Sequence, residues 1–147
     1  MITSPSTLSW KEKYKIDVAR IDLEHKLFLR LINSFKMAMN KGRSDDTLRR
    51  IIDEIEKYAS FHFASEENLM VAINYPEYEE HSWRHKELLE TLMQKKQSIS
   101  GFENFHQFLV EWFIEHTTVE DIRIKHFVDD YNIDVKEFCY DIQEDTL

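Results

Sequence analysis

Apolar residues recur along most of the chain at alternating spacings of three and four residues, which is the pattern of amphipathic helices. The first apolar stripe runs from Ile21 to Met39 and ends before Gly42, a residue that suits the position after a helix end. Ser44 can cap a second helix, whose stripe continues to Ile73. The pattern therefore predicts two long helices in the first half of the chain.

Two further stripes occupy the second half of the chain. Pro76 suits the first position of a third helix, and the stripe that follows it runs from Tyr78 to Leu92. A fourth helix is predicted from about Glu103, with Val119 as the last position of its stripe. Because the connections between these helices are short, sequential helices should be antiparallel. The expected fold class is all-α, an antiparallel up-down-up-down four-helix bundle.

The two ends of the chain extend beyond this bundle. Residues 1–15 are predicted to form an N-terminal arm, and Asp134 is a good N-cap for a short C-terminal helix over 135–143. No change of composition divides the chain, so the whole of it is interpreted as one domain. Its core is expected over about 10–127, followed by a C-terminal extension over 132–147.

Composition and charge narrow the class of protein. The net charge of −9 disfavours nucleic acid and anionic membrane surfaces as partners. No apolar run approaches the roughly 18 residues of a membrane span, and the first residues lack the basic start and apolar centre of a secretory signal. Cys139 is the only cysteine, which excludes an internal disulfide and suits a reducing compartment. We therefore expect a cytoplasmic protein.

Histidine occurs in all four stripes at positions where leucine or isoleucine would be expected. The second stripe also contains Glu66, four residues after His62, so that these two side chains share one helix face. A buried carboxylate is costly unless a positive group compensates it. The polar residues of the four stripes are His25, His62, Glu66, His81, His85 and His116.

These residues predict a metal site. A lone histidine on an apolar face, such as His25, is more often a hydrogen-bonded core residue, but that explanation weakens when all four helices repeat the feature. Imidazole and carboxylate ligands suit zinc, iron, copper or manganese, and the absence of thiolate argues against a structural cysteine-type zinc site. The imidazoles and carboxylates together exceed a tetrahedral ligand set, which favours two metal ions over one.

Asp121 leaves two interpretations open. It follows His116 by five residues, which is about 140° further round an ideal helix, so periodicity indicates a solvated aspartate. To share a site with His116, the helix would have to widen locally, and π-bulges do occur at functional sites. Spacing alone does not decide between these two possibilities.

Four motifs occur in order along the chain, with Tyr75-Pro76 before the third helix. They are Ile-Asp-x-x-His-Lys at 21–26, His-Phe-x-x-Glu-Glu-x-x-Met at 62–70, His-x-x-x-His at 81–85 and Trp-x-x-x-His-x-x-x-x-Asp at 112–121. With these motifs the chain resembles the hemerythrin family, and in particular its single-domain bacterial members, over roughly residues 10–127.

The resemblance implies a non-heme di-iron centre that binds O2 reversibly. One iron would be held by the three imidazoles of the third and fourth helices, and the other, with a vacant position, by those of the first and second. Glu66 and Asp121 would bridge the two irons together with an oxo or hydroxo group. The implied ligands are His25, His62, Glu66, His81, His85, His116 and Asp121.

The resemblance also suggests a pocket for O2. Phe28 and Trp112 lie on the stripes next to metal-site histidines and are expected to wall it. Thr117 and Thr118 stand where the family usually has an apolar residue, and they are included in the pocket. Our hypothesis is that one of these hydroxyls admits water and speeds autoxidation, which Thr117→Ile and Thr118→Leu would test.

Several other residues are predicted to lie outside the site. Glu24 and Asp17 stand where the family usually has glutamine and glycine, and both are interpreted as solvated surface residues. Glu67 is assigned to the outer face of the second helix. No metal or catalytic role is expected for His106 and His126, interpreted as surface or rim residues, or for Cys139.

Three functions compete at this point. The leading one is O2 binding for storage, delivery or sensing, without enzymatic activity, and with a possible protein acceptor as a partner. The alternative is a di-iron enzyme or iron-handling protein, acting on peroxide or nitric oxide or donating iron for iron–sulfur cluster repair. The third is a bundle that stores or is stabilised by another metal. The motifs contain no extra carboxylate as an obvious acid or base, which disfavours the enzyme.

Overall fold

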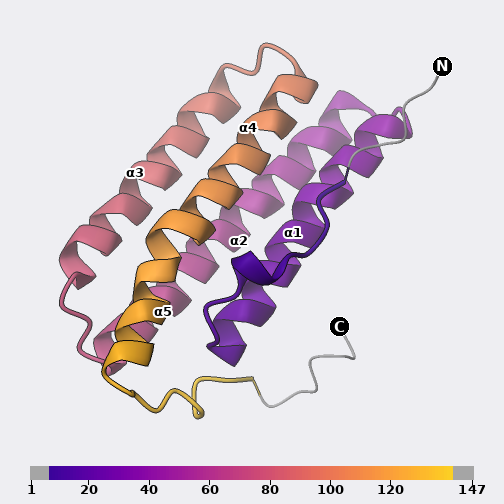
Figure 1. Ribbon diagram of the computed structural model, residues 1–147. Helices are drawn as coiled ribbons and strands as arrows, with labels where there is room; N and C mark the ends of the chain where they lie inside the picture. The colour runs from indigo at the N-terminus through magenta and orange to yellow at the C-terminus, as the bar shows by residue number, and fades with distance from the viewer. Residues whose placement is uncertain (1–6, 141–147) are drawn as a thin grey trace.

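A computed structural model describes residues 7–140. Four long helices form a bundle, and the fourth continues through a π-helix into a short last helix (Figure 1). The expected fold class is confirmed, and the described residues contain no strand. The elements are the 3-10 helix Glu12–Tyr14, α1 (Ala19–Asn40), α2 (Asp45–Ala72), α3 (Tyr78–Gln97), α4 (Phe102–Glu115), the π-helix His116–Glu120 and α5 (Asp121–Asp130). None of these helices is apolar over a length sufficient to cross a membrane.

The helix ends follow from local chemistry. Ser44 caps α2 as predicted, because its Oγ accepts a hydrogen bond from the Thr47 N–H at 3.2 Å. Gly42 adopts the left-handed conformation that follows a helix end, with a φ of 69°. The predicted start of the third helix at Pro76 was wrong by two residues, since Pro76 lies in a turn and α3 begins at Tyr78.

The backbone before α1 is strained at Asp17. Asp17 has a φ of 61°, a region that favours glycine, and it is exposed as expected. The Lys125 ammonium lies 3.4 Å from the Asp17 carboxylate, which ties this turn to α5.

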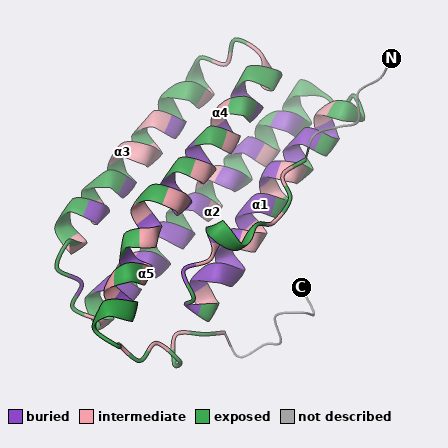
Figure 2. Ribbon diagram, in the orientation of Figure 1, coloured by how far each residue is buried: buried purple, intermediate pink, exposed green. Residues whose placement is uncertain are grey.

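The apolar core is divided into two clusters of buried residues. Figure 2 shows that the buried residues lie on the sides of the helices that face one another. Along α1, Ile21 belongs to one cluster and Phe28 to the other, with His25 between them. Along α2, Phe63 and Leu69 occupy the two clusters in the same way. The polar residues of the stripes therefore lie between two apolar regions that shield them from water.

The last helix lies elsewhere than the sequence suggested. The short C-terminal helix is α5, whereas the described part of the segment expected to be helical, residues 135–140, contains turns, and 141–143 lie outside the described residues. Asp134 Oδ1 does accept a hydrogen bond from the Lys136 N–H at 3.0 Å, but only a turn follows. The Phe138 carbonyl accepts a hydrogen bond from the Arg20 N–H at the start of α1. This carbonyl therefore bonds to another part of the chain and not to a residue of a C-terminal helix.

Candidate metal centre

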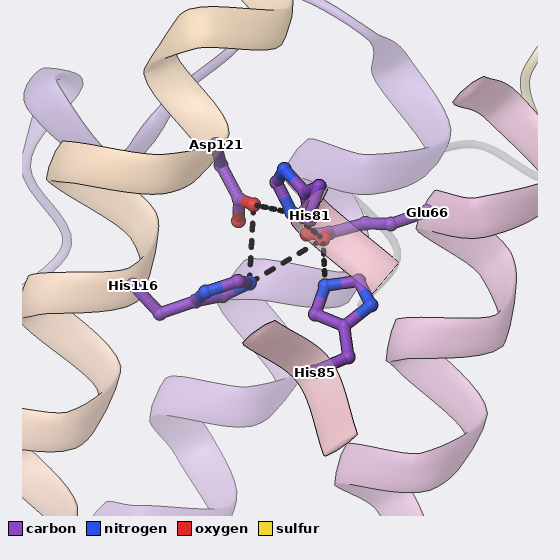
Figure 3. Close-up of side chains that lie close together, drawn as sticks. All are labelled: Glu66, His81, His85, His116 and Asp121. Atoms are coloured by element: carbon purple, nitrogen blue, oxygen red, sulfur yellow. Dashed lines mark hydrogen bonds and ion pairs between the residues drawn. The ribbon is translucent and has the colours of Figure 1, made fainter. Parts of the chain in front are cut away.

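The imidazoles and carboxylates predicted from the four stripes, together with Asp121, converge in the middle of the bundle. Their ligand atoms form two groups, each with all atoms within 4.8 Å of one another, and every member is buried. Figure 3 shows the larger group. One group is Glu66, His81, His85, His116 and Asp121, and the other is His25, His62, Glu66 and Asp121. Both carboxylates belong to both groups.

Glu66 faces the two groups with different oxygens. Its Oε1 lies 2.9 Å from the Nε2 of His85, 3.3 Å from that of His81 and 3.4 Å from that of His116. Its Oε2 lies 2.8 Å from the Nε2 of His62 and 3.5 Å from that of His25. This arrangement places one carboxylate oxygen on each side of the centre.

Asp121 repeats the arrangement from the opposite helix. Its Oδ1 lies 3.1 Å from the Nε2 of His116 and 3.2 Å from that of His81, and its Oδ2 lies 3.1 Å from the Nε2 of His25. Neither Asp121 oxygen, nor the Nε2 of His62, has a hydrogen-bond partner, although all three atoms are buried. Buried polar atoms without partners are rare and need an explanation, and bound cations supply one. The residues present therefore fit a pair of metal ions.

A π-helix brings Asp121 to this place. The five residues His116–Glu120 form one wide turn, so Asp121 is fully buried on the same side as His116. The same turn directs Val119 away from the core, so that this residue is 47% exposed. The assignment of Val119 to the apolar stripe was therefore wrong. The local widening that the five-residue spacing required is thus present.

The two threonines of the π-helix direct their hydroxyls to the preceding turn. Thr117 Oγ1 donates to the Phe113 carbonyl at 2.9 Å, and Thr118 Oγ1 donates to the Ile114 carbonyl at 2.6 Å. Such bonds to a carbonyl four residues earlier bend helices. The hydroxyls are therefore occupied at the start of the widened turn, and their place in an O2 pocket stays a prediction.

The charges of the centre are strongly coupled. Burial alone would lower the pKa values of His25, His81 and His116, but the close approach of these imidazoles to the charged Asp121 and Glu66 outweighs it. They raise the pKa of His25 and His116 to about 10 and that of His81 to about 9. Conversely, although burial alone would raise the pKa of each carboxylate, the imidazoles hold the pKa values of Glu66 and Asp121 below their ordinary range. Without metal, protons on imidazole supply the positive charge that the carboxylates need.

Three of the imidazoles are oriented by acceptors on their outer nitrogen. The Nδ1 of His25 lies 2.9 Å from the Tyr14 carbonyl, that of His62 lies 2.7 Å from Glu24 Oε1, and that of His85 lies 2.8 Å from Glu67 Oε2. An acceptor at Nδ1 fixes the proton there and leaves the Nε2 lone pair for a metal.

Glu24 and Glu67 were therefore assigned wrongly from the sequence. The Glu24 side chain is 1% exposed and the Glu67 side chain 29% exposed, and each accepts a hydrogen bond from a metal-site histidine of the neighbouring helix. Each directly neighbours a ligand residue in the sequence, which turns its side chain toward the next helix. An acidic residue beside a predicted ligand is the signal that could have found them.

Aromatic rings enclose the centre. Phe28 and Trp112 are buried with their ring centroids 5.6 Å apart, and the Trp112 indole N–H donates to the Leu88 carbonyl at 3.3 Å. Phe63, which lies in one of the four sequence motifs but was given no role there, stacks on His85 with centroids 4.1 Å apart. A surface cavity of about 370 Å³ between α3 and α4 reaches Trp112 and His116 from outside.

The two remaining histidines have different surroundings. Neither belongs to the metal-site groups. His126 is exposed as expected, whereas His106 is buried and its ring packs against Phe35, so its interpretation as a surface or rim residue was wrong. Cys139 is exposed.

The fold and the site define a four-helix bundle with a candidate metal site, whose residues come from α1, α2, α3, the π-helix and the first position of α5. A family model described as "Hemerythrin HHE cation binding domain" matches residues 17–126, and the chain belongs to the hemerythrin family. It is 26% identical to a bacteriohemerythrin of Clostridium acetobutylicum, over 76% of this chain and 94% of that protein. It is 27% identical to a myohemerythrin of Theromyzon tessulatum, over 82% of this chain and 93% of that protein.

Proposed function

We propose that this protein binds two iron ions between its four helices and uses them to bind O2 reversibly. The observation that carries the proposal is the pair of ligand groups that share Glu66 and Asp121, with two buried Asp121 oxygens that have no hydrogen-bond partner. Membership of the hemerythrin family and the relatives named bacteriohemerythrin and myohemerythrin support iron and O2 as the metal and the ligand.

The ligand set divides unevenly between the two proposed irons. One takes three imidazoles, and the other takes His25 and His62, while Glu66 and Asp121 serve both. An iron held by His25 and His62 would have one imidazole fewer than its neighbour and would therefore be the one with room for O2. Two irons held by these residues would supply the electrons that reversible O2 binding needs and would take them back when O2 leaves.

The residues around the centre have three tasks in this function. The carboxylates neutralise part of the charge of the two cations. Tyr14, Glu24 and Glu67 hold imidazole protons on Nδ1, so that Nε2 is available to the metal. Phe28 and Trp112 exclude water from the buried centre, which favours release of O2 unchanged over oxidation of the irons.

Optical spectroscopy tests the proposal. The protein is loaded with ferrous iron without oxygen, its iron content is measured, and spectra are recorded before exposure to air, after it, and after oxygen is removed. A visible charge-transfer band that appears with oxygen and disappears on its removal supports the carrier function, and zinc-loaded protein is the control without a band. Irreversible oxidation, or turnover of added peroxide, would instead favour the enzyme.

A further inference from the structure

The segment after α5 returns to the start of α1. In Figure 1 it crosses the end of the bundle, and its last described residues lie beyond the 17–126 span of the family match. The Arg20 N–H donates to the Phe138 carbonyl at 3.1 Å. The Arg20 guanidinium carbon also lies over two aromatic rings, 5.8 Å from the centroid of Phe138 and 4.6 Å from that of Tyr140. Three separate contacts thus hold this segment on one residue of α1.

Tyr140 then reaches toward the metal centre. Its hydroxyl donates a hydrogen bond to Glu24 Oε2. The same carboxylate oxygen accepts a hydrogen bond from Ser65 Oγ at 2.8 Å, and the Arg20 Nε lies 3.4 Å from it. The other oxygen, Oε1, lies 2.7 Å from the Nδ1 of His62. A carboxylate that is almost fully buried thus joins the C-terminal segment to a proposed iron ligand.

Hydrogen bonds to the Glu24 carboxylate change how strongly it increases the electron-donating strength of the His62 imidazole. An anionic acceptor at Nδ1 makes an imidazole a stronger electron donor to a metal at Nε2. Each donor that binds the carboxylate withdraws part of its charge, and this effect is large where water does not screen it. The donors of Arg20, Ser65 and Tyr140 therefore moderate the influence of Glu24 on His62.

We propose that Tyr140 is a positioning residue of the metal centre, which acts through Glu24 to orient His62 and to set its electron-donating strength. The C-terminal segment is then part of the site and more than a covering of the bundle end. This inference rests on the proposed function in that it places an iron on His62.

Two conservative variants test the proposal in iron-loaded protein. Tyr140→Phe keeps the ring on Arg20 but frees Glu24 from one donor, so the reduction potential of the centre should fall. Glu24→Gln removes the negative charge from the acceptor, so the potential should rise. Tyr131→Phe is the matched control, because Tyr131 lies in the same segment and is 71% exposed. Opposite shifts from the two variants, with no shift in the control, support the proposal, since loosened packing alone would not give opposite signs.

Loss of iron to a chelator gives a second readout. Tyr140→Phe should release iron more slowly than the unaltered protein, because a Glu24 freed from one donor makes His62 a stronger electron donor to the iron, while Tyr131→Phe should not change the rate. An unchanged potential together with an unchanged release rate in Tyr140→Phe would overturn the proposal.

Metal-free protein separates this inference from the proposed function. The proton on the Nδ1 of His62, bonded to Glu24, can be followed by 15N-edited NMR, and Tyr140→Phe should shift its resonance whereas Tyr131→Phe should not. A shift in a protein that fails to bind two irons would contradict the proposed function and support the link from Tyr140 to His62. An unshifted resonance would contradict the link whatever metal the protein binds.

Discussion

Glu24 and Glu67 form nearly the same hydrogen bond in two different environments. The Nδ1 of His62 lies 2.7 Å from Glu24, and that of His85 lies 2.8 Å from Glu67. The Glu24 side chain is 1% exposed, while that of Glu67 is 29% exposed. Water screens the charge of Glu67, whereas protein donors surround that of Glu24. The less screened carboxylate thus lies behind His62, on the side of the centre where O2 binding is proposed.

The largest expected effect comes from Glu66, which belongs to both halves of the centre. Glu66→Ala should reduce bound iron from two ions per chain toward none, because each half loses a carboxylate and the two cations lose a shared anion. Glu67→Ala is the comparison one residue away, and at saturating iron it should keep both ions, because it removes only an outer acceptor of His85 and lowers affinity by about 10-fold. Iron analysis of the purified proteins measures this, and two irons in Glu66→Ala would show that Glu66 does not bridge.

Raising the pH should destabilise the metal-free protein. The pKa values of His25 and His116 are about 10 and that of His81 is about 9, against 6.5 for an unperturbed histidine. The folded protein then binds more protons than the unfolded chain between these values, so the free energy of unfolding falls as the pH rises. The stabilisation is complete below about pH 6.5 and is lost as the pH passes through 9 to 10.

Urea unfolding at a series of pH values measures this loss. Metal-loaded protein is the control, because the metals displace the imidazole protons and should remove the decline over this pH range. A metal-free protein equally stable at pH 6.5 and pH 10 would contradict the coupling between the imidazoles and the two carboxylates.

Removal of either outer carboxylate tests whether burial of the acceptor affects iron affinity. Glu24→Ala should weaken iron binding by about 100-fold and Glu67→Ala by about 10-fold, the two ends of the range for partners of metal ligands. The difference arises because water can replace the exposed Glu67 as an acceptor but has little access to the position of Glu24. Competition with a chelator of known affinity measures both, and equal losses would mean that burial of the carboxylate has no influence.

The smallest effect is expected at the π-helix. Thr117→Val and Thr118→Val should each lower the free energy of unfolding by about 1 kcal/mol, the typical contribution of one hydrogen bond, while iron content stays at two per chain. Denaturant unfolding and iron analysis measure the two quantities. A loss of iron in either variant would mean that the hydroxyls are needed to place Asp121.

The fold class and most of the site residues could be predicted from the sequence, because they depend on helix periodicity. His25, His62 and Glu66 follow from a stripe that repeats every three or four residues, and the bundle follows from four such stripes. Asp121 departs from that period, so only the family resemblance placed it in the site, and the π-helix supplies the physical reason. Periodicity assigns a residue to a face but says nothing about how far its side chain reaches, which is why Glu24 was missed.

The C-terminal segment shows a second limit. Local capping signals at Asp134 predicted a helix, but the structure has a turn there and contacts from Phe138 and Tyr140 to Arg20. These contacts join residues more than a hundred positions apart, so local sequence patterns carry no trace of them. Tertiary packing outweighed a local preference at this end of the chain.

The central claim is that two metal ions share Glu66 and Asp121. A crystal structure of the iron-loaded protein, with anomalous diffraction measured at the iron absorption edge, tests it most directly. We predict two anomalous peaks per chain, one beside His25 and His62 and one beside His81, His85 and His116, with a carboxylate oxygen of Glu66 and of Asp121 bound at each. A single peak, or two peaks that share neither carboxylate, would contradict the account.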